Sequence, residues 1–131
     1  MRLIRLKTRP QFLKIAAKGR KAVRPTLLIQ ALQLPEADQT RARRLARVVG
    51  QEPAVFLGFT ASKKVGNAVA RNRAKRRLTA LAQNMVPSMA APGWGLVLIA
   101  RSTTVKAPFA SLEADMCSAL RSVFKKPHVP T

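Results

Sequence analysis

Negative charge is scarce in this sequence, which has five Asp and Glu residues against 25 Lys and Arg, and therefore a formal net charge of +20 over 131 residues. Such a charge attracts polyanions, and either a nucleic acid or an anionic membrane surface would fit. The acidic residues and the single histidine, His128, form no convergent group along the chain. Because nucleophilic, acid–base and metal-dependent hydrolysis all need such a group, we expect no catalytic residue and no metal site in the protein.

Cysteine and long apolar segments are also scarce. The one cysteine, Cys117, excludes an internal disulfide framework and fits a reducing compartment. The longest apolar run, 54–59, is too short to cross a bilayer, and the first ten residues lack the apolar stretch of a secretory signal. These features predict a cytoplasmic location.

Hydrophobic residues make up 47% of the chain, which is typical of a folded domain and not of a disordered basic tail. The length favours one domain over 1–131. Within it we expect a basic N-terminal strip at 1–9, a long basic loop at 35–53 and a flexible tail at 125–131.

Apolar periodicity and the positions of Gly and Pro predict six elements. Helices are expected over 10–18, from 68 to about 85, and from 108 onward, and strands over 26–34, 54–61 and 94–100. The segment 35–53 has no clear period, so we expect a mobile loop with a helical turn around 43–48, and a second loop over 87–95. The buried stripe of the last helix should comprise Phe109, Leu112, Met116, Leu120 and Val123. The order α-β-β-α-β-α predicts an α+β fold with a small central sheet.

The second predicted helix raises a question of charge. It follows Asn67, a suitable N-cap, in the stretch "GFTASKKVGNAVARNRAKRRL", and its first turns carry arginines where the helix dipole favours acids. A run of charge on a helix is usually only a solvated face. Here, however, no Asp or Glu occurs between Glu52 and Glu113 to balance it, and Lys63 and Lys64 precede the helix. We therefore predict a site for RNA or phosphate.

The motif "FTASKKVGNAVARNRAKRRL" closely resembles the signature of the protein subunit of bacterial ribonuclease P. The resemblance extends over about 6–124 and includes the order of elements and the basic N-terminus. It implies a two-layer α/β sandwich with a left-handed βαβ crossover, although the general rule favours right-handed units. It also implies a protein that binds a large catalytic RNA and helps it remove the 5′ leader from precursor tRNA. The hydrolysis would then be performed by the RNA with Mg²⁺, and the protein alone would be inactive.

The resemblance also assigns residues to two surfaces. The catalytic RNA would contact the second predicted helix, with Lys63 and Lys64 close by and Arg77 on the helix flank, and the positions on that helix that match the family are Arg71, Asn72, Arg73, Lys75 and Arg76. The leader would lie between the first helix and the sheet, at Phe12, Ala16 and Gln30.

Three positions depart from what relatives often carry. Ala16 and Gln30 stand where aromatic residues are frequent, so polar contacts should matter more than base stacking in the leader cleft. Thr79 stands where a further arginine can extend the motif, and Arg77 is the residue we expect to replace it.

Two other functions fit the composition. A ribosomal protein would share the charge, size and mixed fold, and the Arg-Asn-Arg motif between strand and helix distinguishes the two. A basic membrane-surface protein would need a helix that exposes large apolar residues, but those residues are required for the core.

Overall fold

The computed structural model describes residues 1–124. The tail 125–131, which includes His128, lies outside the described residues. In chain order the strands and α-helices are β1 (Arg2–Arg5), α1 (Arg9–Lys18), β2 (Arg20–Val23), β3 (Leu27–Gln33), α2 (Glu36–Leu45), β4 (Ala54–Thr60), α3 (Ala68–Met89), β5 (Trp94–Ala100) and α4 (Phe109–Val123). Two short 3₁₀ helices, η1 (Lys63–Val65) and η2 (Ser102–Thr104), precede α3 and α4.

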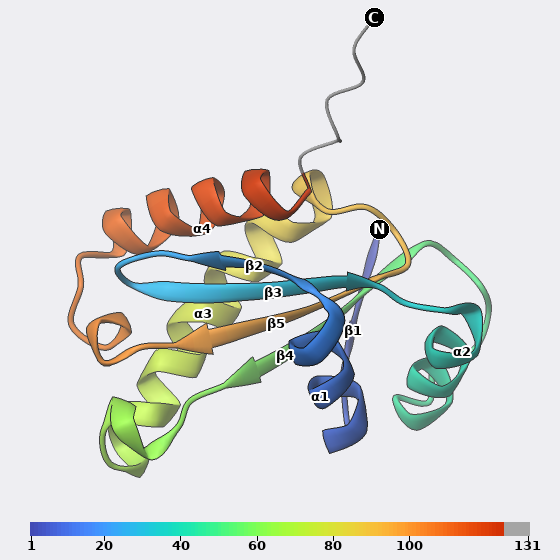
Figure 1. The fold of residues 1–131 in the computed structure, drawn as a ribbon, viewed down its shortest axis with the longest axis horizontal. Helices are drawn as coiled ribbons and strands as arrows, with labels where there is room; N and C mark the ends of the chain where they lie inside the picture. Colours follow the sequence, from blue (N-terminus) through green and yellow to red (C-terminus); the bar gives the residue numbers. More distant parts are fainter. Residues whose placement is uncertain (125–131) are drawn as a thin grey trace, which may run out of the picture.

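The strands form one sheet in the order β1-β4-β5-β3-β2, in which β1, β4 and β5 are parallel while β3 and β2 are antiparallel to their neighbours. Helices α3 and α4 pack against one face of the sheet and α1 against the other. Figure 1 shows α3 passing behind the strands, α4 running along the β2 edge and α1 in front. The predicted α+β fold is therefore confirmed.

Side-chain alternation along β3 separates the two faces of the sheet. Leu27, Ile29 and Ala31 are buried in the main core under α3 and α4. Leu28 and Gln30 point to the opposite face and are only half-buried, because α1 is too short to cover all of that face. The sheet thus has one fully packed face and one face that is partly open.

The sequence patterns missed the two edge strands. β1 and β2 have four residues each, and their sequences "RLIR" and "RKAV" carry no strand signal of their own. Each is fixed by pairing: β1 lies parallel to β4, and β2 lies antiparallel to β3. The expected N-terminal strip at 1–9 therefore contains a strand, and Arg2 and Arg5 lie on that strand at the edge of the sheet.

The prediction that 35–53 is a loop throughout was wrong, because α2 occupies its first half. The expected helical turn at 43–48 was placed too late, since α2 ends at Leu45 and Arg47 has a positive φ of 57°. The helix offers no apolar stripe to recognise in the sequence, because the residues it buries are Ala42 and an arginine, Arg43. The Arg43 guanidinium donates to the carbonyls of Glu52, at 2.7 Å, and Gly50, at 3.4 Å.

Two helices also differ in detail from prediction. α3 continues through Pro87 to Met89, where a loop was expected. Pro87 lies in the last turn, so the hydrogen bond it cannot donate and the clash of its ring with the carbonyl four residues back disturb only the end of the helix. In α4 the predicted stripe is buried from Leu112 to Val123, but Phe109 is 44% exposed. Its ring lies beside the Arg77 guanidinium, with 5.8 Å between Arg77 Cζ and the ring centroid.

We predict that Arg43→Met destabilises the fold by about 1–3 kcal/mol, because two carbonyls lose a charged donor. Arg44→Met is the matched control, since Arg44 is exposed on the same helix. Urea denaturation of the two variants measures the difference. Equal midpoints would show that Arg43 does not hold the segment after α2.

Candidate RNA interface

The start of α3 is built by two caps. Ser62 accepts a hydrogen bond from the backbone N–H of Lys64 and begins η1, and the Asn67 side chain accepts one from the N–H of Ala70 at 2.9 Å. Gly66, between them, has a φ of 146°, which an L side chain rarely adopts. The capping role predicted for Asn67 is confirmed. The turn leaves Lys63 and Lys64 exposed at the N-terminal end of the helix.

The two faces of α3 differ sharply in polarity. Its buried residues are Ala74, Leu78, Leu81, Ala82 and Val86. Four of the predicted RNA-binding residues are exposed, namely Asn72, Arg73, Lys75 and Arg76, and Arg71 is half-buried. The helix contains no acidic residue. Its exposed face is therefore a cationic surface without internal charge balance.

Arg77 lies half-buried on the flank of α3, as predicted, but its guanidinium is engaged within the protein. Its guanidinium donates to the carbonyl oxygens of Thr104, Val105 and Ala107, at 2.7, 3.0 and 2.5 Å. Burial lowers the pKa of Arg77, and the neighbouring Arg73 cation adds to the effect. Arg77 thus anchors α3 to the segment before α4, and both of its terminal nitrogens are engaged there. Its contact with RNA stays a prediction.

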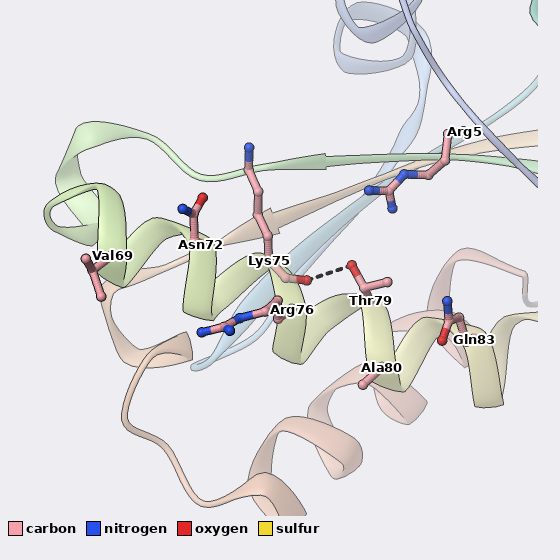
Figure 2. Close-up of a pocket in the computed structure, with 8 residues that line it drawn as sticks. All are labelled: Arg5, Val69, Asn72, Lys75, Arg76, Thr79, Ala80 and Gln83. Atoms are coloured by element: carbon pink, nitrogen blue, oxygen red, sulfur yellow. Dashed lines mark hydrogen bonds between the residues drawn. The ribbon is translucent and has the colours of Figure 1, made fainter. Parts of the chain in front are cut away.

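A shallow cavity of about 680 Å³ lies along the exposed face of α3. Its α3 side is formed by Asn72, Lys75, Arg76 and Thr79, together with Val69, Ala80 and Gln83. The opposite side is formed by Arg5, which reaches over from β1 (Figure 2). Sequence reasoning missed Arg5 because the strand that carries it was not recognised.

Phe12 lies on the other face of the sheet, packed onto β4. A Cβ atom added at Gly58 would come within 2.3 Å of the Phe12 ring, so the ring lies directly on the Gly58 backbone. Ile15, one turn later, approaches Gly95 of β5 in the same way, at 2.8 Å from an added Cβ. Two glycines therefore allow α1 to pack close to the sheet.

Gln30 lies in the same register row as Gly58, with Val97 of β5 between them. Paired residues share a face, so Gln30 and the Phe12 ring lie on one side of the sheet, two strands apart. The next row comprises Val23, Leu28, Ile99 and Thr60, all half-buried or exposed. This open, mostly aliphatic strip borders Phe12, and Ala16 is half-buried one helical turn along α1.

Metal-binding clusters are not found in the part of the chain that the structure describes: no three His, Cys, Asp or Glu side chains there are placed to hold a metal ion. Within 1–124, no helix has the length and apolarity needed to cross a membrane.

Comparison with known proteins gives consistent results. The family model described as Ribonuclease P matches residues 1–124. The ribonuclease P protein component of Ruegeria pomeroyi is 43% identical over 119 residues, covering 90% of this chain and 84% of that protein. The corresponding protein of Paramagnetospirillum magneticum is 39% identical over 122 residues, covering 93% of this chain and 84% of that protein.

Solved structures show the same fold at lower identity. The ribonuclease P protein of Staphylococcus aureus superposes with a TM-score of 0.70 at 22% identity, covering 93% of this chain and 98% of that one. The protein of Thermotoga maritima gives a TM-score of 0.68 at 18% identity, covering 91% and 96%.

The contrast between Arg76 and Arg77 gives a prediction about stability. Arg77→Met should lower the free energy of unfolding by about 1.5–3 kcal/mol, because three carbonyls lose a charged donor. Arg76→Met, one residue away and exposed, should change it by less than about 0.5 kcal/mol. Urea denaturation of both variants checks this, and a larger loss for Arg76 would contradict the assignment of Arg77 as the structural arginine.

Proposed function

This chain belongs to the ribonuclease P protein family, and we propose that it binds the catalytic RNA of that enzyme and the 5′ leader of precursor tRNA. The observation that carries the proposal is the acid-free cationic face of α3, which lies within a family match spanning 1–124. The protein is accordingly part of an endoribonuclease holoenzyme, and its proposed place of action is the bacterial cytoplasm.

The α3 surface is proposed to bind the RNA through its phosphates. Guanidinium and ammonium groups that neutralise phosphates release condensed counterions, and this makes the binding strong at low salt. Arg76 and Lys75 face the cavity, and Asn72 adds amide donors beside them. These residues have no carboxylate partner among the described residues, so no ion pair within that part of the chain has to break before RNA binds.

The open strip on the opposite face is proposed to bind the leader. Phe12 is half-buried beside it and can stack on one base, while Leu28 and Ile99 offer an aliphatic floor. Gln30 contributes an amide that can both donate to and accept from a base edge. Since Ala16 adds no ring, the proposed recognition combines one stacking contact with polar and apolar contacts.

Catalysis is proposed to reside in the RNA, with Mg²⁺ bound there. The described residues include no metal cluster, and the carboxylates are scattered: Asp38 is paired with Lys14, Glu52 with Arg2, and Asp115 accepts from Thr26. The protein's own contribution is positioning and charge neutralisation. Fixed positive charge offsets the repulsion between the catalytic RNA and its substrate, which otherwise requires a high concentration of Mg²⁺.

The leader surface can be tested through Phe12. Phe12→Ala should weaken binding of precursor tRNA to the holoenzyme by about 1–3 kcal/mol, the range for one base stack, and leave binding of mature tRNA nearly unchanged. Gly58→Ala should act in the same direction, because the added methyl group displaces the Phe12 ring. Equal losses for precursor and mature tRNA would assign Phe12 to the core alone.

The location of catalysis can be tested by measuring cleavage against Mg²⁺ concentration. The RNA alone should cleave precursor tRNA at high Mg²⁺, the protein alone at no concentration, and the two together at lower Mg²⁺ than the RNA alone. The protein should lower the required Mg²⁺ concentration by less for substrates with very short leaders. Cleavage by RNA-free protein, or a Mg²⁺ curve that the protein does not shift, would overturn the mechanism.

A further inference from the structure

We infer that Arg5, held on the ring of Phe59, is a phosphate-binding residue of the RNA surface, supplied by β1 in place of an arginine at position 79. The inference rests on the proposed function of the α3 face. It extends that surface from one helix to a groove between two elements, β1 and α3.

β1 is held firmly enough to position a side chain. It pairs with β4 in parallel register, with Arg5 opposite Leu57, and the N–H of Leu6 donates to the Leu57 carbonyl at 2.8 Å. At its other end the Arg2 guanidinium donates to Glu52 at 2.8 Å, and this bond lowers the pKa of the Glu52 carboxyl. Arg5 therefore projects from a paired strand and not from a free terminus.

Within 1–124 an aromatic ring orients the Arg5 guanidinium, and no residue there accepts a hydrogen bond from it. Its Cζ lies 4.5 Å from the centroid of the Phe59 ring, the closest of the cation–ring contacts among residues 1–124. Stacking on a ring face leaves the edge of the guanidinium, which carries the N–H groups, free for a ligand. Arg77 is the opposite case, because carbonyl oxygens occupy its donors. Arg5 is thus both oriented and available.

Past Arg76 along α3, Arg5 is the only charged residue among the described residues that line the groove. Thr79, opposite Arg5, donates its hydroxyl to the Lys75 carbonyl at 2.7 Å and so is bound within its own helix (Figure 2). Beyond Thr79 the lining residues are Ala80 and Gln83, which are uncharged. Without Arg5 the cationic part of the groove would end at Arg76.

The lining chemistry favours a phosphodiester backbone as the ligand. From Val69 to Gln83 the groove follows α3 for about 21 Å, at ~1.5 Å per residue. No carboxylate lines it within the described residues, and its donors are two guanidinium groups, one ammonium group and amides. Arginine binds phosphate oxygens bidentately, and a groove of this length spans several successive phosphates. None of its lining residues within 1–124 is aromatic, so the groove offers no aromatic anchor to a protein partner.

The test is a rescue experiment that measures binding of full-length protein variants to ribonuclease P RNA at several salt concentrations. Arg5→Ala should weaken binding about tenfold and lower the log–log salt slope by about one unit, as expected for one lost phosphate contact. Arg44→Ala, an exposed arginine on α2, is the control for loss of charge and should have a much smaller effect.

Adding Thr79→Arg to Arg5→Ala should restore most of the affinity and slope, because the new guanidinium enters the same groove from α3. Thr40→Arg, on the exposed side of α2, adds the same charge elsewhere and should not restore them. Equal rescue by both additions would overturn the inference and leave only an effect of net charge.

The role of the ring is tested with Phe59→Leu, which keeps Arg5 but removes the stacking surface. It should weaken binding about two- to fivefold, the equivalent of one exposed cation–π contact, with the circular dichroism spectrum unchanged. Arg76→Ala separates the two proposals. If Arg76→Ala weakens binding while Arg5→Ala does not, the inference fails and the proposed function stands; if neither variant matters, the proposed function fails.

Discussion

The excess of positive charge is the constraint on which the rest of this structure depends. With 25 cationic residues and five acids, most arginines can have no carboxylate partner. The fold meets this constraint with backbone carbonyl oxygens: Arg43 donates to the segment after α2, and Arg77 donates to the segment before α4. Arg20 and Arg101 donate to carbonyls of Val123 and Arg24 in the same manner. Carbonyl partners satisfy the donors of a guanidinium but do not cancel its charge, so the folded protein keeps nearly all of its attraction for a polyanion.

This use of carbonyls separates two kinds of arginine that look alike in sequence. Arg76 and Arg77 are neighbours in one basic run, yet Arg77 is held by three carbonyls and Arg76 lines an open cavity. A helical wheel places Arg77 on the flank of the apolar stripe, but it does not show that the segment before α4 will pass there. That information lies in the tertiary contacts, so the sequence could place Arg77 on the helix flank but could not show that carbonyl oxygens engage it there.

The parts of the fold that sequence predicted are those with a strong local signal. The bounds of β5 and the capping of α3 by Asn67 follow from the apolar run and the Gly-Asn break, and the structure confirms both. β1 and α2 were missed because their stability comes from partners: β1 is fixed by its pairing with β4, and α2 by a buried arginine instead of an apolar stripe. The candidate site divides in the same way. The α3 face was predicted from its composition, whereas Arg5 depends on an edge strand that carries no pattern of its own.

Two neighbouring residues of β4 support the two proposed RNA surfaces. Gly58 supports the Phe12 ring on the front of the sheet, and Phe59, the next residue, supports the Arg5 guanidinium on the back. Alternation along a strand makes this arrangement possible, since successive residues face opposite sides. The two positions also require residues of opposite size. At position 58 a side chain would displace the Phe12 ring, whereas at position 59 a large flat ring is needed to support Arg5. A shift of one residue in the β4 register would place the ring of Phe59 against Phe12 and leave Arg5 without support, so both surfaces depend on the pairing of β4 with β5 and β1.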